Sequence, residues 1–356
     1  MDTLRVALVG YGLAGRVFHG PLLTAAGLNV TSVVTRNPER IAQVAEDLPL
    51  ARVLATAADV WARAEDHDLV VIASDNASHA TMARSAIEHG LPVVVDKPLA
   101  VTAADAVDLV RRAEAAGLLL TVFQNRRWDA DQLTLRRLID DGVLGDVLRH
   151  ESRFERWRPG PPKDRWRETA SVAEGGGLLI DLGSHLVDQA VALFGPVSHL
   201  YAEVDSRRGG ADDDSFLALT HLTGVRSHLW AGVMAGAPGP RRRVLGTRGA
   251  YVVQDLDGQE EALRAGLRPG DDTWGVSAAG GQYVQRGSER EDLRGERGRW
   301  DAFYPAVAAA LIEGGPPPVD PYDAVATLRI IEAARHSAAT GSVIPVTTEP
   351  EQPAGS

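Results

Sequence analysis

The chain has 356 residues, which exceeds the usual size of one compact domain, so its length favours two domains. With 44% hydrophobic and 24% charged residues and a formal net charge of -11, it is too polar for a membrane protein and too acidic for a protein whose main partner is nucleic acid. The absence of cysteine excludes disulfides, cysteine nucleophiles and thiolate metal sites. Because the sequence begins with a strand-like run and has no signal-peptide pattern, we expect a cytoplasmic protein.

The first third of the chain alternates apolar strand-like runs with helical segments. Strands are predicted at residues 4–10, 29–35, 68–74, 92–95 and 118–123, and helices at 14–26, 38–47, 79–88 and 103–116. This alternation is typical of βαβ units. The fold class is therefore α/β, with residues 1–123 predicted to form a Rossmann domain, a doubly wound parallel sheet that binds a dinucleotide.

The rest of the chain has a different order of predicted helices and strands. It is predicted to contain helices at 131–140, after the triple glycine 175–177, and at 301–313 and 322–340, with a strand at 147–154 and short alternating strands between 197 and 253. This pattern predicts a large, mainly antiparallel sheet. We expect residues 124–346 to form a C-terminal α+β domain for substrate binding and oligomerisation, and 347–356 a polar tail.

Two features of this second region are less regular. Residues 258–299 are rich in Gly, Arg, Asp and Glu and predict loops with an edge hairpin. The closing helix at 322–340 is expected to pack back on the first domain.

The run VALVGYGLAG carries the strongest functional signal. Its glycines follow a predicted strand and open a predicted helix. In that context Gly10 permits a tight turn, Gly12 lets the backbone approach a pyrophosphate, and Gly15 lets the helix pack closely on the strand. The alternative is an ordinary glycine-rich turn. The residues predicted to bind the cofactor here are Gly10, Tyr11, Gly12, Leu13, Ala14 and Gly15.

The end of the second predicted strand indicates which dinucleotide is bound. An NAD-binding domain usually has an acidic residue there that contacts the ribose. This sequence has Thr35 and Arg36 instead, with Arg40 one helical turn further on. Because a guanidinium pairs with a 2′-phosphate and a carboxylate repels it, the pattern favours NADP over NAD. The alternative is that both arginines are solvated surface residues.

Polar residues also follow two later strands, in the runs SDNASH and DKP. The cofactor-binding residues predicted in these runs are Ser74, Asp75, Asn76, His79, Asp96, Lys97 and Pro98. The carboxyl ends of parallel strands are where open α/β sheets bind ligands, so Lys97 is poorly explained by core packing. The alternative is a surface lysine beside a turn proline.

The run GGGLLIDLGSHLVDQ separates Asp181 from His185 by four positions and His185 from Asp188 by three. On a helix these side chains share one face. A carboxylate and an imidazole placed this way can bind a substrate hydroxyl and accept its proton. The alternative is a first-turn aspartate and a hydrogen-bonded core histidine.

Taken in order, VGYGLAG, SDNASH, DKP, NRRWD and GGGLLIDLGSHLVD resemble the Gfo/Idh/MocA family of nicotinamide-dependent oxidoreductases, over nearly the whole chain. The runs NRRWD, FERWRP, DRWRE and IDLGSHLVDQA are similar to the branch that contains NADP-dependent scyllo-inositol dehydrogenase. Two positions depart from the family pattern: Asp75 replaces the usual proline, and Asp96 replaces the commoner glutamate.

The resemblance implies hydride transfer between NADP, or with less support NAD, and a secondary alcohol of an inositol-like polyol or sugar. It implies catalytic roles for Lys97, Asp181 and His185, with His185 taking the alcohol proton and Lys97 binding the same oxygen. Trp166 and Arg167 are expected beside the cofactor. The predicted substrate-binding residues are Lys97, Arg127, Trp128, Trp157, Asp181 and His185. The arginines and tryptophans can instead pack at the domain junction.

Two other functions stay open at this point. One is an enzyme of the same fold acting on an aldose, a keto-sugar or a dihydrodiol, and the other is a non-catalytic NADP-binding sensor or regulator. The joint presence of Lys97, Asp181 and His185 speaks against the sensor. No metal is predicted, since no HxxxH-type cluster or clustered carboxylates occur. An exposed antiparallel sheet predicts a homodimer or homotetramer.

Overall fold

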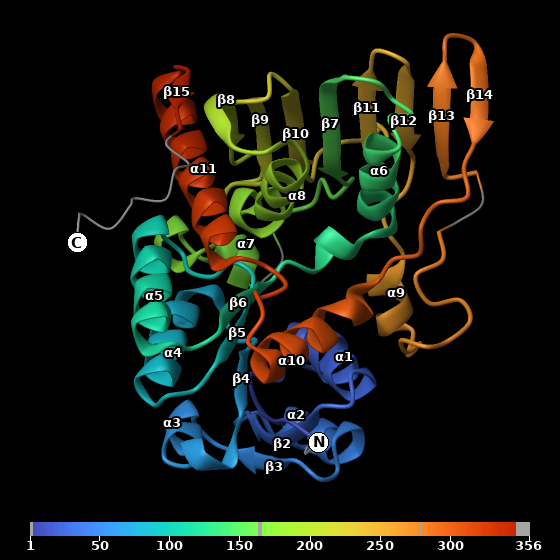
Figure 1. Cartoon of the computed structure of the whole chain (residues 1–356). Coiled ribbons are helices and arrows are strands. Elements are labelled where there is room, and N and C mark those ends of the chain that lie inside the picture. The colour runs from blue at the N-terminus through green and yellow to red at the C-terminus, as the bar shows by residue number, and fades with distance from the viewer. Residues whose placement is uncertain (1–2, 163–165, 278–279, 347–356) are drawn as a thin grey trace. The chain divides into compact units, whose positions relative to one another are not determined.

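The computed structural model describes residues 3–162, 166–277 and 280–346, and the chain forms two compact units (Figure 1). The first unit consists of Met1–Asn125, Gly258–Gly275 and Arg299–Pro321. The second consists of Arg126–Asp257, Val276–Gly298 and Tyr322–Ser356. The chain therefore crosses between units several times, whereas the sequence suggested one boundary near residue 123. The closing helix belongs to the second unit, and its packing against the first unit stays a prediction.

The first unit is built on a six-stranded parallel sheet in the order β3-β2-β1-β4-β5-β6. The strands are β1 (Arg5–Val9), β2 (Asn29–Val34), β3 (Arg52–Leu54), β4 (Leu69–Ile72), β5 (Val93–Asp96) and β6 (Leu120–Phe123). Strands β4, β5 and β6 are buried along their whole length, as expected for a parallel sheet that is covered on both faces. The strand order reverses at β1 and β4, which is where such sheets bind ligands.

Helices of the first unit lie between and after these strands. They are η1 (Ala14–His19), α1 (Gly20–Ala25), α2 (Pro38–Asp47), α3 (Ala57–Trp61), η2 (Ala64–Asp66), α4 (Asn76–Glu88), α5 (Ala103–Ala116), α9 (Gln259–Arg264), η6 (Trp300–Ala302) and α10 (Phe303–Glu313). Helix α2 begins where its sequence predicts, because the Asn37 side chain accepts hydrogen bonds from the amides of Glu39 and Arg40. The helix predicted at 14–26 differs: its first part, η1, is a π-helix.

An aromatic cluster explains why residues 299–321 join the first unit. Trp300, Phe303 and Tyr304 are completely buried, and Phe303 meets Phe123 of β6 edge-on with ring centroids 5.0 Å apart. The Tyr304 hydroxyl also lies 2.5 Å from Nδ1 of His19. Complete burial lowers the pKa of His19 to about 4, so this histidine packs in its neutral form.

The second unit contains a nine-stranded sheet in the order β14-β13-β12-β11-β7-β10-β9-β8-β15. The strands are β7 (Val147–Glu155), β8 (Val197–Asp205), β9 (Asp214–His221), β10 (Arg226–Gly232), β11 (Arg242–Gly246), β12 (Gly249–Val253), β13 (Gln282–Arg286), β14 (Glu289–Asp292) and β15 (Ile344–Pro345). Among the described strands of this sheet, only β7 and β10 pair in parallel. The mainly antiparallel sheet and the edge hairpin, β13–β14, are thus confirmed.

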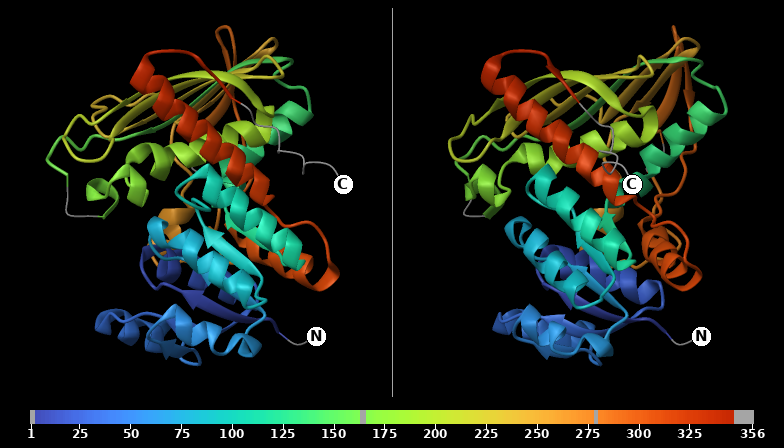
Figure 2. Two further views of the ribbon diagram at one scale, coloured as in Figure 1. Left: turned by 90° about the vertical axis from the view of Figure 1, so that its left-hand side faces the viewer. Right: turned by 60° about the vertical axis from the view of Figure 1, so that its left-hand side comes forward.

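One face of this sheet is covered by helices of the same unit (Figure 2). The described helices of this unit are η3 (Asn125–Trp128), α6 (Ala130–Asp140), α7 (Trp166–Thr169), η4 (Val172–Glu174), η5 (Leu179–Gly183), α8 (Ser184–Phe194) and α11 (Pro321–Thr340). Helices α8 and α11 share a hydrophobic core with β8, β9 and β10. The segment Val172–Phe194 is long and apolar enough to cross a membrane by length and composition, but 72% of its most apolar 18-residue stretch is buried inside the protein, as in the core helix of a globular domain.

Candidate functional site

The glycine-rich loop between β1 and η1 is packed so closely that it tolerates no side chain at two of its glycines. Gly10 has a φ of 101°, and a Cβ there would lie 2.6 Å from the carbonyl oxygen of Ala73 after β4. A Cβ on Gly15 would overlap the carbonyl oxygen of Gly10. The loop therefore has the tight turn and the close helix approach of a dinucleotide-binding loop.

A guanidinium group lies over the same loop. The position of a Cβ on Gly12 is 3.8 Å from Nη2 of Arg40, which stands in the first turn of α2 and is exposed. Arg36 is exposed at the end of β2, and Thr35 is buried beside it, with its amide donating to the Leu54 carbonyl at 3.0 Å. The positive charges of both arginines are thus available to an anion at the end of β2.

The ends of β4 and β5 are joined through one buried imidazole. Nδ1 of His79 lies 2.7 Å from the Pro98 carbonyl oxygen, and Nε2 lies 3.4 Å from the Ser74 carbonyl oxygen. His79 therefore fixes the two polar turns to each other. Asn76 is buried at the start of α4. Asp75 has a φ of -77°, which proline also adopts, so the departure from the family pattern leaves this turn unchanged.

Lys97 follows the buried strand β5 directly and is half-buried. Its amide donates to Oδ1 of the neighbouring Asp96 at 2.8 Å, and the Lys97–Pro98 peptide bond is cis. Oδ1 of Asp96 also lies 3.9 Å from Nε2 of His19. The Asp96 carboxylate is therefore engaged within the protein, where it shapes the turn that presents Lys97.

In the second unit, Asp181 and His185 stand where a π-helix passes into an α-helix. Asp181 lies in the π-helical turn η5, and His185 is the second residue of α8. Such π-helical turns are frequent at functional sites. Asp181 is half-exposed and His185 is 5% exposed. The helix that the sequence predicted is thus present, but its first turn is wider than an α-helical turn.

The start of η5 is held by an aspartate that sequence reasoning missed. Oδ1 of Asp212, just before β9, accepts a hydrogen bond from the Leu179 amide at 2.7 Å, and Oδ2 accepts one from Nη1 of Arg335 at 3.0 Å. A Cβ on Gly177 would overlap this carboxylate, which accounts for part of the triple glycine. Nothing in the run ADDD distinguishes this aspartate from its neighbours, because its partners are far away in the sequence.

The predicted substrate residue Arg127 is paired with carboxylates of its own unit. Its Nη2 and Nε lie 2.6 and 2.9 Å from the two carboxylate oxygens of Asp188, one turn after His185 in α8. Nη2 also lies 2.9 Å from Oδ2 of Asp323. Arg127 therefore holds α8 in place, and its contact with substrate stays a prediction.

The predicted tryptophans lie in different environments. Trp128 is half-buried, whereas Trp157 is 59% exposed and forms an isolated bridge with Met234 beyond β7. The side chains of Trp166 and Arg167 lie outside the described part of the structure, so their predicted place beside the cofactor is untested. Of these residues, only Trp128 lies in η3 beside Arg127, the partner of Asp188.

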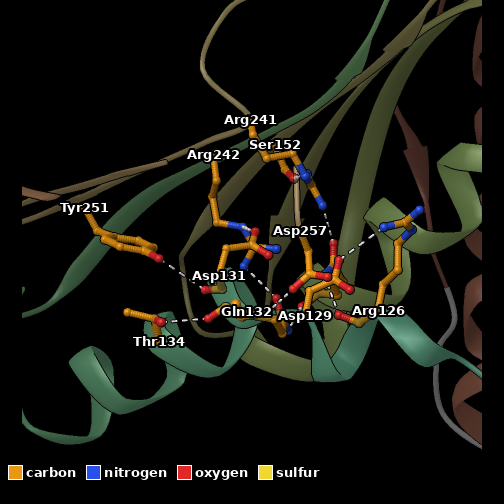
Figure 3. A network of polar contacts seen from close by, with 12 residues as sticks. Arg126, Asp129, Asp131, Gln132, Thr134, Ser152, Arg241, Arg242, Tyr251 and Asp257 are labelled. Carbon is orange, nitrogen blue, oxygen red and sulfur yellow. Dashed lines mark hydrogen bonds and ion pairs between the residues drawn. The ribbon is translucent and has the colours of Figure 1, made fainter. Parts of the chain in front are cut away.

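A largely buried polar network that the sequence did not reveal joins the start of α6 to the start of β11 (Figure 3). Its charged members are Arg126, Asp129, Asp131, Arg241, Arg242 and Asp257. Nε of Arg242 lies 3.0 Å from Oδ2 of Asp131, and Nη1 of Arg126 lies 3.4 Å from Oδ2 of Asp129. Asp257 accepts a hydrogen bond from the Ala130 amide at 2.8 Å. Charged runs such as NRRWDAD and PRRRV look like surface segments until their strands are placed.

One carboxyl group of this network, that of Asp129, has a strongly raised pKa. Complete burial, together with the negative charge of Asp257, raises the pKa of Asp129 to about 8. The attraction of Arg126 acts in the opposite direction but is weaker. Burial therefore favours the protonated form of the Asp129 carboxyl in the folded protein.

Comparison with known proteins agrees with this architecture. Residues 4–124 match the domain described as "Oxidoreductase family, NAD-binding Rossmann fold", and residues 136–348 match "Oxidoreductase family, C-terminal alpha/beta domain". The chain belongs to the Gfo/Idh/MocA oxidoreductase family. The first unit contains the glycine-rich loop and Lys97, and the second contains Asp181 and His185.

Individual Gfo/Idh/MocA relatives match over nearly their full length. Scyllo-inositol 2-dehydrogenase (NADP(+)) IolW of Bacillus subtilis is 35% identical over 344 residues, which are 95% of this chain and 94% of IolW. D-apiose dehydrogenase of Rhizobium rhizogenes is 26% identical over 365 residues, with 97% and 98% coverage. The solved structure of the oxidoreductase YvaA from Bacillus subtilis superposes with a TM-score of 0.90 at 33% identity, covering 97% of this chain and 99% of YvaA.

We predict that Asp129→Asn changes how stability depends on pH. The folded-state pKa of about 8 lies above the ordinary value of 3.8, so the folded state holds its proton more tightly than the unfolded state. This contribution to stability is complete below about pH 4 and is lost as the pH rises through about 8. In thermal unfolding between pH 5 and 9, the Tm of the variant should fall less than that of the wild type, by roughly 5 °C, since a proton held over three pH units corresponds to about 4 kcal/mol.

The control for this measurement is Asp292→Asn, which makes the same substitution at an exposed carboxylate that pairs with Arg290. It should keep the wild-type dependence of Tm on pH. If Asp129→Asn also keeps it, the carboxyl of Asp129 is ionised in the folded protein at neutral pH and the assignment of its pKa is wrong.

Proposed function

We propose that this protein is an NADP-dependent dehydrogenase that acts on a secondary alcohol of an inositol-like polyol or sugar. One observation carries the proposal. In this Gfo/Idh/MocA chain, a half-exposed Asp181 and a nearly buried His185 stand where a π-helical turn passes into an α-helix. A carboxylate and an imidazole at a turn of this kind are suited to binding a hydroxyl and moving its proton. The NADP-dependent scyllo-inositol dehydrogenase among its relatives supports the substrate class.

The residues of the first unit fit a dinucleotide. The loop at Gly10 and Gly15 leaves room only for backbone, so its amides can approach a pyrophosphate. Arg40 above Gly12 and Arg36 at the end of β2 provide positive charge for a 2′-phosphate. When bound, NADP supplies the carbon that accepts or donates the hydride.

In this proposal, three side chains act on the substrate. His185 accepts the proton of the alcohol at a ring nitrogen and returns it in the reverse reaction. Lys97 donates a hydrogen bond to the same oxygen and stabilises the negative charge that develops there, an interaction for which roughly 3 kcal/mol per donor is typical. Asp181 accepts a hydrogen bond from a neighbouring hydroxyl and orients the ring of the substrate.

A second candidate is a dehydrogenase for an aldose or a related sugar. It is favoured by the D-apiose dehydrogenase among the relatives, which matches over almost the whole chain at lower identity. A polyol and a sugar present similar secondary alcohols to the same three side chains, so the choice between them depends on the remaining contacts with the substrate.

The test of this proposal is the initial rate of nicotinamide reduction with scyllo-inositol, myo-inositol, glucose and an apiose-like aldose, each with NADP and with NAD. We expect turnover with NADP and an inositol. Lys97→Ala and His185→Ala should lower turnover at least about 100-fold while nucleotide binding persists. The control His336→Ala, on the exposed side of α11, should keep the wild-type rate.

The outcomes separate the candidates. A rate only with the aldose would favour the second candidate. Nucleotide binding with no rate on any substrate would contradict a dehydrogenase for these classes and favour a sensor. A near-normal rate in Lys97→Ala or His185→Ala would remove that residue from the mechanism.

We also predict how the two arginines discriminate between cofactors. Arg36→Ala and Arg40→Ala should each weaken NADP binding about 10-fold or more, because a charge-assisted hydrogen bond to a phosphate contributes about 1.5–3 kcal/mol. NAD, which lacks the 2′-phosphate, should bind with nearly unchanged affinity. Calorimetric titration of both nucleotides measures this, with Arg52→Ala on the edge strand β3 as control. Equal losses for NADP and NAD would show that the arginines do not recognise the 2′-phosphate.

We further propose a cytoplasmic homodimer or homotetramer assembled through the uncovered face of the large sheet. On β9 and β10 the residues alternate between fully buried and half-buried, and the half-buried ones include Phe216, His228 and Trp230. Half-buried aromatic residues on an open sheet face are suited to association. Sedimentation velocity should show an oligomer at micromolar concentration, and a monomer alone would contradict this assembly.

A further inference from the structure

The imidazole of His185 packs against a ring that also carries two buried guanidinium groups. His185 and Phe154, on β7, have ring centroids 6.4 Å apart and ring planes at 61°. The Cζ atoms of Arg126 and Arg241 lie 5.0 and 4.2 Å from the centroid of the same Phe154 ring. Four segments that are far apart in the sequence therefore meet at one phenyl ring.

We propose that Arg126 and Arg241 are positioning residues for His185. They hold the Phe154 ring against the imidazole, and their buried positive charge favours the neutral imidazole, which is the form that accepts a proton. This inference rests on the proposed function, in which His185 is the proton acceptor. Neither arginine is expected to touch substrate or cofactor.

The arginines are tied to the helix that carries His185 as well as to the ring. Gln189, one turn after His185 in α8, is fully buried. Its Nε2 donates to the Arg126 carbonyl oxygen at 2.7 Å, and its Oε1 accepts from Nη2 of Arg241 at 2.9 Å. The carbonyl oxygen of Gln189 accepts from Nε2 of Gln132 at 3.2 Å. One side chain thus sets the distance between α8 and both arginines.

The strand side of the assembly is tied in the same way. Nη1 of Arg241 donates to the hydroxyl of Ser152, two residues before Phe154 on β7. Ser152 in turn pairs with Arg242 in the register of β7 and β11. Because the guanidinium of Arg241 reaches both Ser152 (Figure 3) and Gln189, it bridges the strand that carries the Phe154 ring and the helix that carries His185.

The charge balance of the network favours a net positive charge behind the ring. Three arginines, at 126, 241 and 242, face three aspartates, at 129, 131 and 257. The raised pKa of Asp129 favours its neutral form and so shifts the balance of the network toward positive charge. Burial lowers the pKa of Arg241 to about 10, which still leaves it charged at neutral pH.

Among the described residues of the second unit, the other charged side chains near this end of α8 are one carboxylate, Asp181, and groups that are ion-paired; the proposed function adds the positive charge of Lys97, which every variant below keeps. Asp181 lies in the turn before His185, and a nearby negative charge favours the protonated form of an imidazole. Asp188, one turn after it, is paired with Arg127, which also contacts Asp323 of α11. The positive charge at Phe154 therefore offsets the effect of Asp181. When a unit positive charge lies about 10 Å from an imidazole, in surroundings of effective dielectric constant about 20, its removal raises the pKa of the imidazole by about one unit.

The experiment is an NMR titration of the histidine Cε1–H resonances in the full-length protein without substrate, in which His185→Gln assigns the resonance of His185. Arg241→Gln and Arg126→Gln should each raise the pKa of His185 by about one unit. Arg241→Lys, which keeps the charge, should restore the wild-type value. Arg243→Gln is the matched control, because it removes the same charge two residues further along the chain. The Arg243 side chain is half-exposed and pairs with Glu151 of β7.

An unchanged pKa of His185 in a folded Arg241→Gln protein would overturn the inference, and Arg126→Gln decides the question if Arg241→Gln does not fold. A rise in Arg243→Gln equal to that in Arg241→Gln would also overturn it, because the effect would then not be local. The titration needs no turnover. A shifted pKa without activity on any polyol or sugar would contradict only the proposed function, whereas activity with an unshifted pKa would contradict only this inference.

Discussion

The attachment of α8 to its sheet is the interaction on which the second unit depends most. Apolar packing against β8, β9 and β10 covers one side of the helix. On another side, Gln189 and Asp188 hold it through hydrogen bonds and an ion pair to segments more than 50 residues away. Apolar contacts allow a helix to slide or turn slightly at little cost, whereas directional polar contacts specify one register. A side chain used for proton transfer must be held in one position and orientation.

Burying so many charges is not the most stable way to build this core. Each buried ion loses its hydration, and pairs such as Arg242–Asp131 recover that loss only with good geometry. A hydrophobic replacement of similar volume often gives equal or higher stability. The network is therefore better explained by what it does to its neighbours, namely placing Phe154 and setting the charge near His185, than by its contribution to stability.

The first unit relies on a different constraint, which is the lack of space around its glycine-rich loop. Gly10 lies against the end of β4, and Gly15 lies against Gly10, so β1, β4 and η1 approach each other through backbone atoms alone. His79 then ties the end of β4 to the turn that presents Lys97. The cofactor loop and the lysine are thus held by one connected set of contacts within this unit.

The sequence by itself determined the Rossmann sheet, the glycine loop, the lysine after β5, the antiparallel character of the second sheet and the family. These features depend on local spacing: alternation of period two, glycines at fixed intervals and polar residues directly after apolar strands. The short strand β3 and helix α9 were missed because three to six residues carry little periodicity. Tertiary structure alone decided that residues 258–275 and 299–321 join the first unit. It also decided that Arg127 pairs with Asp188 and that burial raises the pKa of Asp129. The reason is the same in each case, since burial and charge pairing depend on partners that are distant in the chain and leave no pattern in the residues around them.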